Sequence, residues 1–515
     1  MKLLPCFLNI LTGWQKSFGD HRTYKRAVGF SLAFLVCLGR RTISRAICAQ
    51  QRQFRAWSPD YKFFSESPWD PTSLFDTVVD EAHPLMSQDQ PLVVALDDTP
   101  CRKTGKKIPW AKWLRDPLSP PFNTNLVWSL RFLHAALLLW PAKAEGAARA
   151  IPISFQLAPA VKKPKAPKKP KKSAKSDSAE AKDAEAKYEK ALKAHKQALT
   201  EYRQKQRKEG LSAQGVRLLK DLRSRFDKYS ALSSKILWAV VDASFCNHTV
   251  FQEFPDRIVL IGRTRKDIRL YAEPNEKTKK GKGRKRIYGD PLPTPEEFRK
   301  DTSVPWKRCK IFAAGKKHNL RYKTLDRVLW KSGAGSRPMC LIVIAPLAYR
   351  AHGHLLYRRE AYLLVSDPSI DISTALQAYF YRWEIEADQK EEKDLLGVGQ
   401  AQVWSKKAVP RQPAFHVASY AMLLVAAIKA YGLNTIKAAG RLPLWRRKNP
   451  PTRLSAGQLI GLLRHELDVY ESTPTKKSLR RSPKRSGQFQ VAALEQRIGM
   501  KIPVSVRAIL DNAWT

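Results

Sequence analysis

Short continuous apolar runs recur along the chain, and two of them end in acidic residues. The run PLVVALDDT at 91–99 is typical of a buried β-strand, because both of its faces are apolar until the terminal acids. Similar runs predict four more strands, at 125–140, 150–159, 235–242 and 257–265.

Other segments carry a helical pattern. Residues 1–88 contain apolar side chains at helical spacing followed by a basic stretch. The segment from Ala179 to Ser230 is rich in Ala, Glu, Lys and Leu, which favours a long helix interrupted near Gly210. A further helix is expected to follow Ser366 and to run to about Leu396, and another is expected around Phe415–Tyr431.

These patterns divide the chain into five parts. They are an N-terminal helical region at 1–88, the first part of an α/β domain at 89–265 with a basic linker at 159–178, a β-rich basic insertion at 266–360, the completion of the α/β domain at 361–400, and a helical basic region at 401–515. The N-terminal region fits either a small DNA-binding domain or a helical cap on the next domain, and both interpretations stay open.

The charge balance indicates the class of partner. The 515 residues include 93 Lys and Arg against 46 Asp and Glu, a formal net charge of +47. So basic a surface attracts polyanions and releases counterions when it neutralises phosphates, so we expect a nucleic-acid partner. The run VKKPKAPKKPKKSAK at 161–175 has a composition that cannot bury a core, and it is either a solvated tether or a DNA-gripping segment.

Cysteine usage and hydropathy bear on the compartment. The seven cysteines include no C-x-x-C pair, which argues against a zinc finger and against a disulfide framework. The longest apolar runs, such as the one from Gly29, are shorter than the roughly 20 residues that span a bilayer. We therefore expect a soluble, intracellular protein that is not associated with a membrane.

The order of the predicted elements suggests a fold. Three strands, a long helix, a fourth strand, a short helix, a fifth strand and a later helix describe an α/β, ribonuclease H-like layout. That fold places one acid on its first strand, one at the end of its fourth and one on a late helix. Asp97, Asp242 and Glu386 occupy those places. Asp98 is an alternative to Asp97, since successive strand residues point to opposite faces.

The late helix carries a stripe of polar side chains. At about 100° per residue, Tyr379, Arg382, Glu386 and Lys393 fall within a sector of about 60°. A Tyr, two cations and one carboxylate on one face suit phosphate contacts beside a metal ion. An ordinary solvated charged face is the alternative on geometry alone.

Three motifs resemble a known family. The spacing Tyr379-x2-Arg382-x3-Glu386-x6-Lys393 is similar to the Y-R-E-K signature of DDE-type insertion-sequence transposases of the insertion-sequence-four type. VVALDDT and WAVVDASF resemble the first-acid and second-acid motifs of the same enzymes. The resemblance covers roughly residues 90–400, and the basic linker with its long helix enlarges the gap between the first two acids.

The resemblance implies a chemistry and a set of roles. Asp97, Asp242 and Glu386 would hold two Mg²⁺ or Mn²⁺ ions, which take oxygen ligands and serve in-line phosphodiester transfer. Tyr379, Arg382 and Lys393 would contact DNA phosphates near the cut. The expected partner is double-stranded DNA, both element ends and target, bound by a homodimer. A metal-dependent nuclease of the same fold and an inactive DNA-binding descendant are the alternatives.

Overall fold

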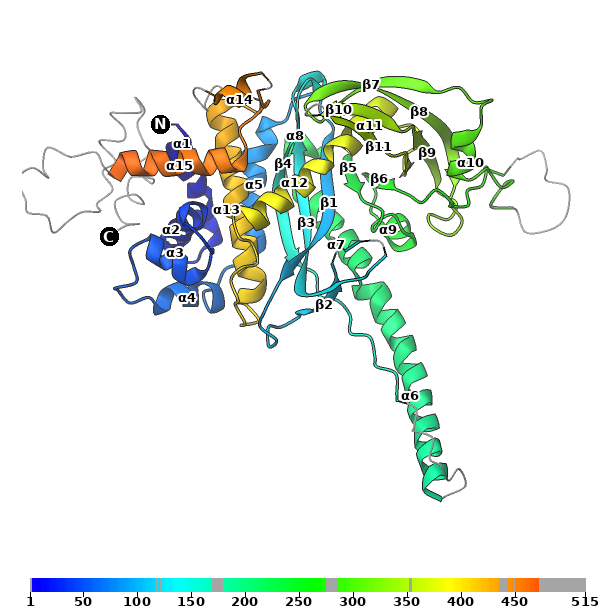
Figure 1. Ribbon diagram of the computed structural model, residues 1–515, viewed down its shortest axis with the longest axis horizontal. Coiled ribbons are helices and arrows are strands. Elements are labelled where there is room, and N and C mark those ends of the chain that lie inside the picture. Colours follow the sequence, from blue (N-terminus) through cyan, green and yellow to red (C-terminus); the bar gives the residue numbers. More distant parts are fainter. Residues whose placement is uncertain are drawn as a thin grey trace, which may run out of the picture.

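A computed structural model describes residues 2–116, 119–120, 122–168, 179–274, 286–351, 354–434, 442–448 and 450–471 (Figure 1). The segment 169–178 of the predicted linker, most of the basic centre at 275–290 and the basic segment at 472–485 lie outside these residues. The protein is a mixed α/β structure built on one large sheet, as the sequence predicts.

The sheet has ten strands in the order β2-β3-β1-β5-β6-β12-β9-β8-β7, with β4 paired to β3. Its strands are β1 (Leu92–Arg102), β2 (Lys112–Arg115), β3 (Leu126–Leu139), β4 (Arg149–Leu157), β5 (Leu237–Val241), β6 (Ile258–Arg263), β7 (Lys307–Ala313), β8 (Lys316–Leu329), β9 (Pro338–Ile344) and β12 (Ala361–Val365). A separate hairpin joins β10 (Leu347–Ala351) to β11 (His354–Arg358). The five strands predicted ahead of residue 266 are all present.

The α-helices cover both faces of this sheet. They are α1 (Leu3–Leu11), α2 (His21–Val36), α3 (Ile43–Ala49), α4 (Ser58–Ser65), α5 (Pro71–Ala82), α6 (Ala179–Glu209), α7 (Leu211–Phe226), α8 (Ser230–Ser233), α9 (His248–Glu253), α10 (Pro295–Lys300), α11 (Ile372–Tyr381), α12 (Trp383–Asp394), α13 (Ala408–Tyr431), α14 (Leu444–Arg447) and α15 (Ala456–Glu471).

Strand β1 is apolar on both faces because helices pack against each face. Leu92, Val94 and Leu96 belong to a core shared with α7, α13 and the N-terminal helices. Val93 and Ala95, which point the other way, belong to a second core shared with α11. Burial on both sides explains why the run carries no polar alternation, and it fixes which strand ends can hold polar groups.

Strand directions differ across the sheet. β1 runs antiparallel to β3 and parallel to β5, and β5 runs parallel to β6. β12 then pairs antiparallel with both β6 and β9. The carboxyl ends of β1, β5 and β6 therefore meet at one edge of the sheet.

The N-terminal region is helical, as predicted, and it packs on the C-terminal helices. The side chain of Glu466 on α15 accepts hydrogen bonds from the N–H groups of Lys2, Leu3 and Leu4 at 2.7–3.2 Å, so it caps the first turn of α1. Helices α1, α2 and α5 also contact α13 and share its core. This packing suits the helical-cap interpretation; whether the region binds DNA stays a prediction.

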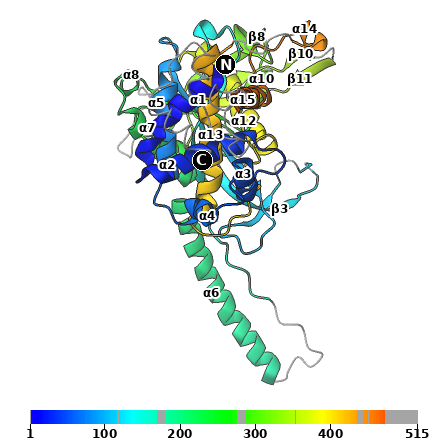
Figure 2. The same ribbon diagram turned by 90° about the vertical axis from the view of Figure 1, so that its left-hand side faces the viewer.

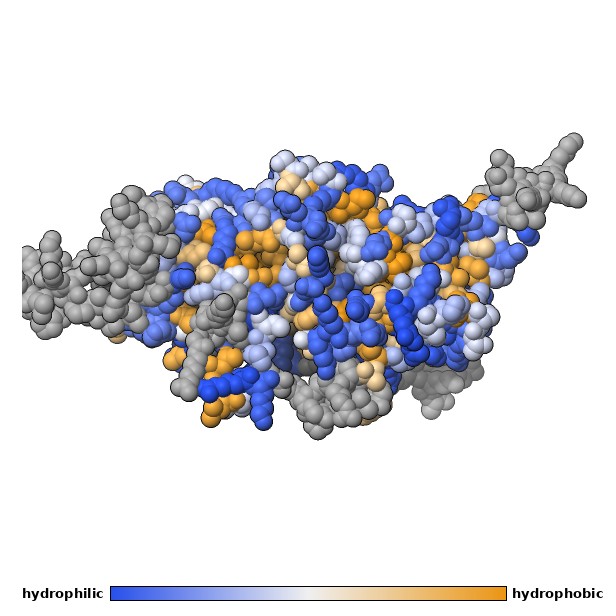
Figure 3. Space-filling model, turned by 90° about the horizontal axis from the view of Figure 1, so that it is seen from above, coloured by the Kyte–Doolittle hydropathy of each residue, from blue (hydrophilic) through white to orange (hydrophobic). Residues whose placement is uncertain are grey.

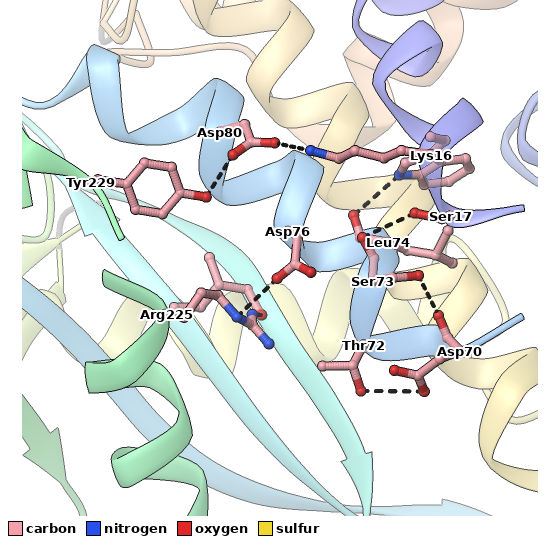
Figure 4. A network of polar contacts seen from close by, with 12 residues as sticks. Lys16, Ser17, Asp70, Thr72, Ser73, Leu74, Asp76, Asp80, Arg225 and Tyr229 are labelled. Carbon is pink, nitrogen blue, oxygen red and sulfur yellow. Dashed lines mark hydrogen bonds and ion pairs between the residues drawn. The ribbon is translucent and has the colours of Figure 1, made fainter. Parts of the chain in front are cut away.

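Polar contacts tie α5 to the sheet domain as well (Figure 4). Asp80 accepts a hydrogen bond from the Tyr229 hydroxyl at 2.6 Å and pairs with Lys16 at 2.5 Å. Asp76 pairs with Arg225 of α7 at 3.1 Å. The helical region and the α/β domain therefore share one interface with both apolar and ionic contacts.

Residues 266–360 are β-rich, as predicted, and their strands extend the main sheet. β7, β8 and β9 continue it beyond β12, so the insertion is joined to the α/β domain by backbone pairing. The apolar run at 340–350 divides between β9 and β10.

Seen from above, the surface is mostly hydrophilic with scattered hydrophobic areas (Figure 3).

Helix α13 is the one helix among the described residues that is long and apolar enough to cross a membrane. However, 83% of its most apolar stretch is buried inside the protein, where it contacts α1, α5 and β4. Its composition is thus that of a core helix enclosed by its own domain.

The long helical segment predicted from Ala179 to Ser230 divides into α6 and α7 at Gly210, whose ψ of 169° is extended. Figures 1 and 2 both show α6 projecting away from the body. The two helices differ in environment, because α7 is packed against the sheet while α6 is largely exposed.

Candidate active site

Two of the predicted acids are neighbours because of strand register. β1 and β5 pair in parallel, with Leu96 aligned to Val241. Asp97 directly follows Leu96, and Asp242 directly follows Val241. Adjacent strands lie about 4.8 Å apart, so this register brings the two carboxyl groups together at the carboxyl edge of the sheet. Open α/β sheets commonly build sites at this edge.

The electrostatics of Asp97 reflect this proximity. Burial is the main cause that raises its pKa, and the negative charge of Asp242 adds to it, so the pKa reaches about 7. The Arg382 guanidinium and the hydrogen bond from the Asp98 N–H, at 2.8 Å, act in the opposite direction but do not balance it. The ionised form of Asp97 is therefore disfavoured in this position.

Asp242 lies directly after β5, in the turn that leads to α9. Its Oδ1 accepts hydrogen bonds from the Ser244 N–H at 2.8 Å and from the Ser244 hydroxyl at 2.6 Å. These bonds fix the orientation of the carboxylate and engage one of its two oxygens.

Arg382 links the third predicted acid to the first. Its Nη2 lies 2.6 Å from Glu386 Oε1, and its Nη1 lies 3.9 Å from Asp97 Oδ2. The Arg382 side chain is 11% exposed, so this cation is held at the site by two carboxylates. The Arg382 guanidinium therefore lies between Asp97 and Glu386 and is paired with Glu386.

Asp98 has a different direct partner. Its Oδ2 lies 3.2 Å from Nε of Arg131 on β3. Burial raises the pKa of Asp98, Arg131 opposes that rise, and the charge of Asp242 contributes to it. Asp97 faces Arg382 and the helix that carries Glu386, whereas Asp98 is neutralised by the sheet; this favours Asp97 as the first acid.

The helix with the polar stripe differs from the prediction in one detail. The single helix predicted between Ser366 and Leu396 is divided into α11 and α12 at Arg382. There the Ile385 N–H bonds to the Arg382 carbonyl three residues back, which tightens the turn. The chain keeps helical dihedrals at Arg382, so the side chains on either side still lie one turn apart.

The outer members of the predicted stripe occupy two other environments. Tyr379 is 5% exposed, and its ring belongs to the core beneath α11. It also lines a pocket of about 660 Å³ together with Arg263, Arg358 and Arg359. Lys393 lies on α12 close enough to Asp98 to lower its pKa. Arg382 and Glu386 are therefore the two stripe residues in direct contact.

Two polar residues of β3 were missed by the sequence analysis. His134 is aligned with Asp97 in the antiparallel register and is fully buried, with its Nε2 3.5 Å from Glu392 Oε1 on α12. Burial lowers the pKa of His134 to about 3 and raises that of Glu392, so it disfavours the charged form of both. A single His and the Arg131 that pairs with Asp98, in an otherwise apolar strand, were the available signals.

The donor set can be compared with what a divalent cation requires. Asp97 and Asp242 offer neighbouring carboxylate oxygens, which suit a hard cation. Among the described residues, no three His, Cys, Asp or Glu side chains are grouped so that they could hold a metal ion, and Glu386 is paired with Arg382. A cation bound at the aspartate pair would compete with Arg382 for the charge of Asp97.

A family model described as DDE superfamily endonuclease matches residues 6–337. The matched part contains Asp97 and Asp242 and ends before α11, so it does not include Glu386. Among curated proteins, none matches the chain.

Proposed function

Because the chain belongs to the DDE superfamily of endonucleases, we propose that it is a transposase that cuts DNA at the ends of a mobile element and joins them to target DNA. The observation that carries this proposal is the β1–β5 register, which sets Asp97 beside Asp242 at the edge where Arg382 leads to Glu386.

The sheet topology supports a ribonuclease H-like core. Its five-stranded unit would be β4-β3-β1-β5-β6, in which β3 runs antiparallel to both of its neighbours and β5 and β6 run parallel to β1. The first acid lies on the central strand and the second follows the adjacent one, the places that this fold gives to its catalytic carboxylates.

The proposed cofactor is Mg²⁺ or Mn²⁺, held by Asp97, Asp242 and Glu386. Two such ions, when bound, activate a water or a 3′-hydroxyl and stabilise the leaving oxygen of the displaced phosphodiester. The protein's own part is to orient these carboxylates, and the Ser244 bonds do this for Asp242.

Arg382 has a second proposed role. Its guanidinium balances Asp97 and Glu386 in the free protein, and DNA phosphate is an equally suitable partner for a planar, bidentate donor. Exchange of Glu386 for phosphate would release that carboxylate for metal binding as the DNA arrives. Lys393, and Tyr379 beside Arg358, are proposed to contact DNA phosphates near the cut.

The test uses duplex DNA taken from the two flanks of this gene, incubated with protein and Mg²⁺. Cleaved and strand-transferred products together support a transposase. Cleavage without joining would indicate a plain nuclease, and binding without either product would indicate an inactive DNA-binding descendant. Glu386→Gln is the control, since it keeps the shape of the side chain but removes its charge.

A further inference from the structure

An arm projects from the body next to the candidate active site. We define the arm as residues 159–168 together with helix α6, which at 31 residues is about 46 Å long. Figures 1 and 2 show that it extends away from the rest of the molecule. No step of the chemistry proposed above uses it.

The base of the arm is fixed to the edge of the sheet that carries the acids. The amide of Asn247, five residues after Asp242, donates to the Ser212 hydroxyl at 2.9 Å just beyond the end of α6. On α7, Gly215 approaches Phe245 so closely that a Cβ would lie 2.9 Å from its ring. A duplex that reaches Asp242 therefore arrives beside the base of the arm.

The half of α6 nearest the body is strongly cationic. Between residues 189 and 209 it carries seven cations and three carboxylates, Glu189, Glu201 and Glu209. All seven are exposed: Lys190, Lys193, Lys196, Arg203, Lys205, Arg207 and Lys208. Residues 159–168 of the arm add four more exposed cations, Lys162, Lys163, Lys165 and Lys168.

In the part of the chain that the structure describes, no ion pair joins any of these cations to a carboxylate. Among the described residues, the one ion pair on α6 joins Lys187 to Asp183 at 2.7 Å, in the half of the helix away from the body. At about 100° per residue, Lys193, Lys196, Arg203 and Arg207 fall within a sector of about 80°, so they form one stripe. Unpaired cations repel one another along this stripe, and a polyanion relieves that repulsion.

We propose that this stripe binds the backbone of the DNA duplex whose scissile bond lies at the Asp97–Asp242 edge. The inference rests on the proposed function for the identity of the polyanion. Its span of about 21 Å from Lys193 to Arg207 corresponds to roughly six base pairs. Contacts of this kind grip the backbone and carry no base information, so the arm adds affinity for any duplex sequence.

A second copy of the chain is the competing occupant. Tyr188, Leu192, Leu199 and Tyr202 are half-buried on the neighbouring face of α6 at the four-three spacing of a coiled coil. Residues 159–168 already cover part of this face, since residues 161–165 and Tyr202 line one groove. The uncovered stripe is cationic rather than apolar, which favours DNA.

The experiment measures how binding of a random-sequence duplex of about 30 base pairs depends on salt, without divalent metal. Each phosphate contact contributes about 0.9 to the slope of log affinity against log salt. The combined variant K193Q, K196Q, R203Q and R207Q should therefore lower the slope by about two to four and weaken binding at least tenfold. Its melting temperature should not change, because the replaced side chains are exposed.

The matched control removes four cations from the β7–β8 hairpin, on the other side of the body in Figure 1: K307Q, R308Q, K310Q and K317Q. Its slope should fall by less than about one. An equal fall in both variants, or none in the arm variant, overturns the proposal.

Two further measurements separate this inference from its alternatives. The double variant Leu192→Gln, Leu199→Gln tests for a dimer by sedimentation. If it converts a dimer to a monomer, and the arm variant keeps the wild-type slope of log affinity against log salt, the arm binds a second copy and the proposal is wrong. If the wild-type protein never cuts DNA with Mg²⁺ but the arm variant still loses slope, the transposase function fails and the arm's DNA contact stands.

Discussion

Replacing Asp97 by Asn should stabilise the metal-free protein at neutral and alkaline pH. Burial and the charge of Asp242 raise the pKa of Asp97 from 3.8 to about 7. The folded state therefore resists ionisation of this carboxyl, and the unfolded chain does not. Stability is highest below the unfolded pKa and is lost as the pH rises from about 4 through 7.

The size of the effect follows from the two pKa values. A rise from 3.8 to about 7 corresponds to roughly 4 kcal/mol against the ionised form. Asn cannot ionise, keeps the shape of Asp, and retains an oxygen for the Asp98 N–H. The variant should be more stable than wild type by roughly 4 kcal/mol near pH 8, and by less than about 1 kcal/mol near pH 4.

Urea unfolding in EDTA, followed by fluorescence at several pH values, measures this difference. Asp256→Asn is the control, because Asp256 is exposed on the same domain and makes no ion pair among the described residues. A gain in stability that does not depend on pH, or a loss of stability near pH 8, would refute the reasoning. Adding Mg²⁺ should stabilise the wild-type protein and not the variant, since binding to the folded state alone shifts the unfolding equilibrium.

Three other changes have defined outcomes. Arg382→Ala should tighten Mn²⁺ binding in the absence of DNA, as measured by calorimetry, and should slow cleavage of every end sequence alike. Arg382→Lys should recover part of the cleavage rate. If the Arg382→Ala protein cuts at the wild-type rate but has a lower melting temperature, Arg382 is a structural residue. Glu466→Ala should lower stability by about 2–4 kcal/mol in urea unfolding, because three N–H groups of α1 lose their acceptor; an unchanged midpoint would contradict this. Gly399→Ala should destabilise by more than about 1 kcal/mol, since φ is 90° and a Cβ would lie 2.9 Å from Cys101, and thermal melting equal to wild type would show that the turn can relax.

The elements and the acid pair could be predicted because they depend on local pattern. Strands buried on both faces leave an uninterrupted apolar run, and the position of Asp97 and Asp242 at the end of such runs is visible in the sequence. Parallel pairing of β1 and β5 then brings the two together.

The contacts of the third acid could not be predicted from the same patterns. Helical periodicity places Arg382 and Glu386 one turn apart, but it does not reveal that Arg382 also reaches Asp97, because that contact depends on how α12 crosses the sheet. Likewise His134 lies opposite Asp97 through antiparallel register with β3, which the sequence of either strand alone does not specify. The full convergence of Asp97, Asp242 and Glu386 on metal stays a prediction.

The central claim is that these three acids form one metal-dependent site for cutting DNA. The most direct measurement is Mg²⁺-dependent nicking of plasmid DNA carrying the gene's flanks, compared between wild type and the single variants D97N, D242N and E386Q. The account predicts that each variant binds the DNA with nearly wild-type affinity and that each loses nicking entirely. Nicking at the wild-type rate by any one of the three would remove that residue from the site and contradict the account.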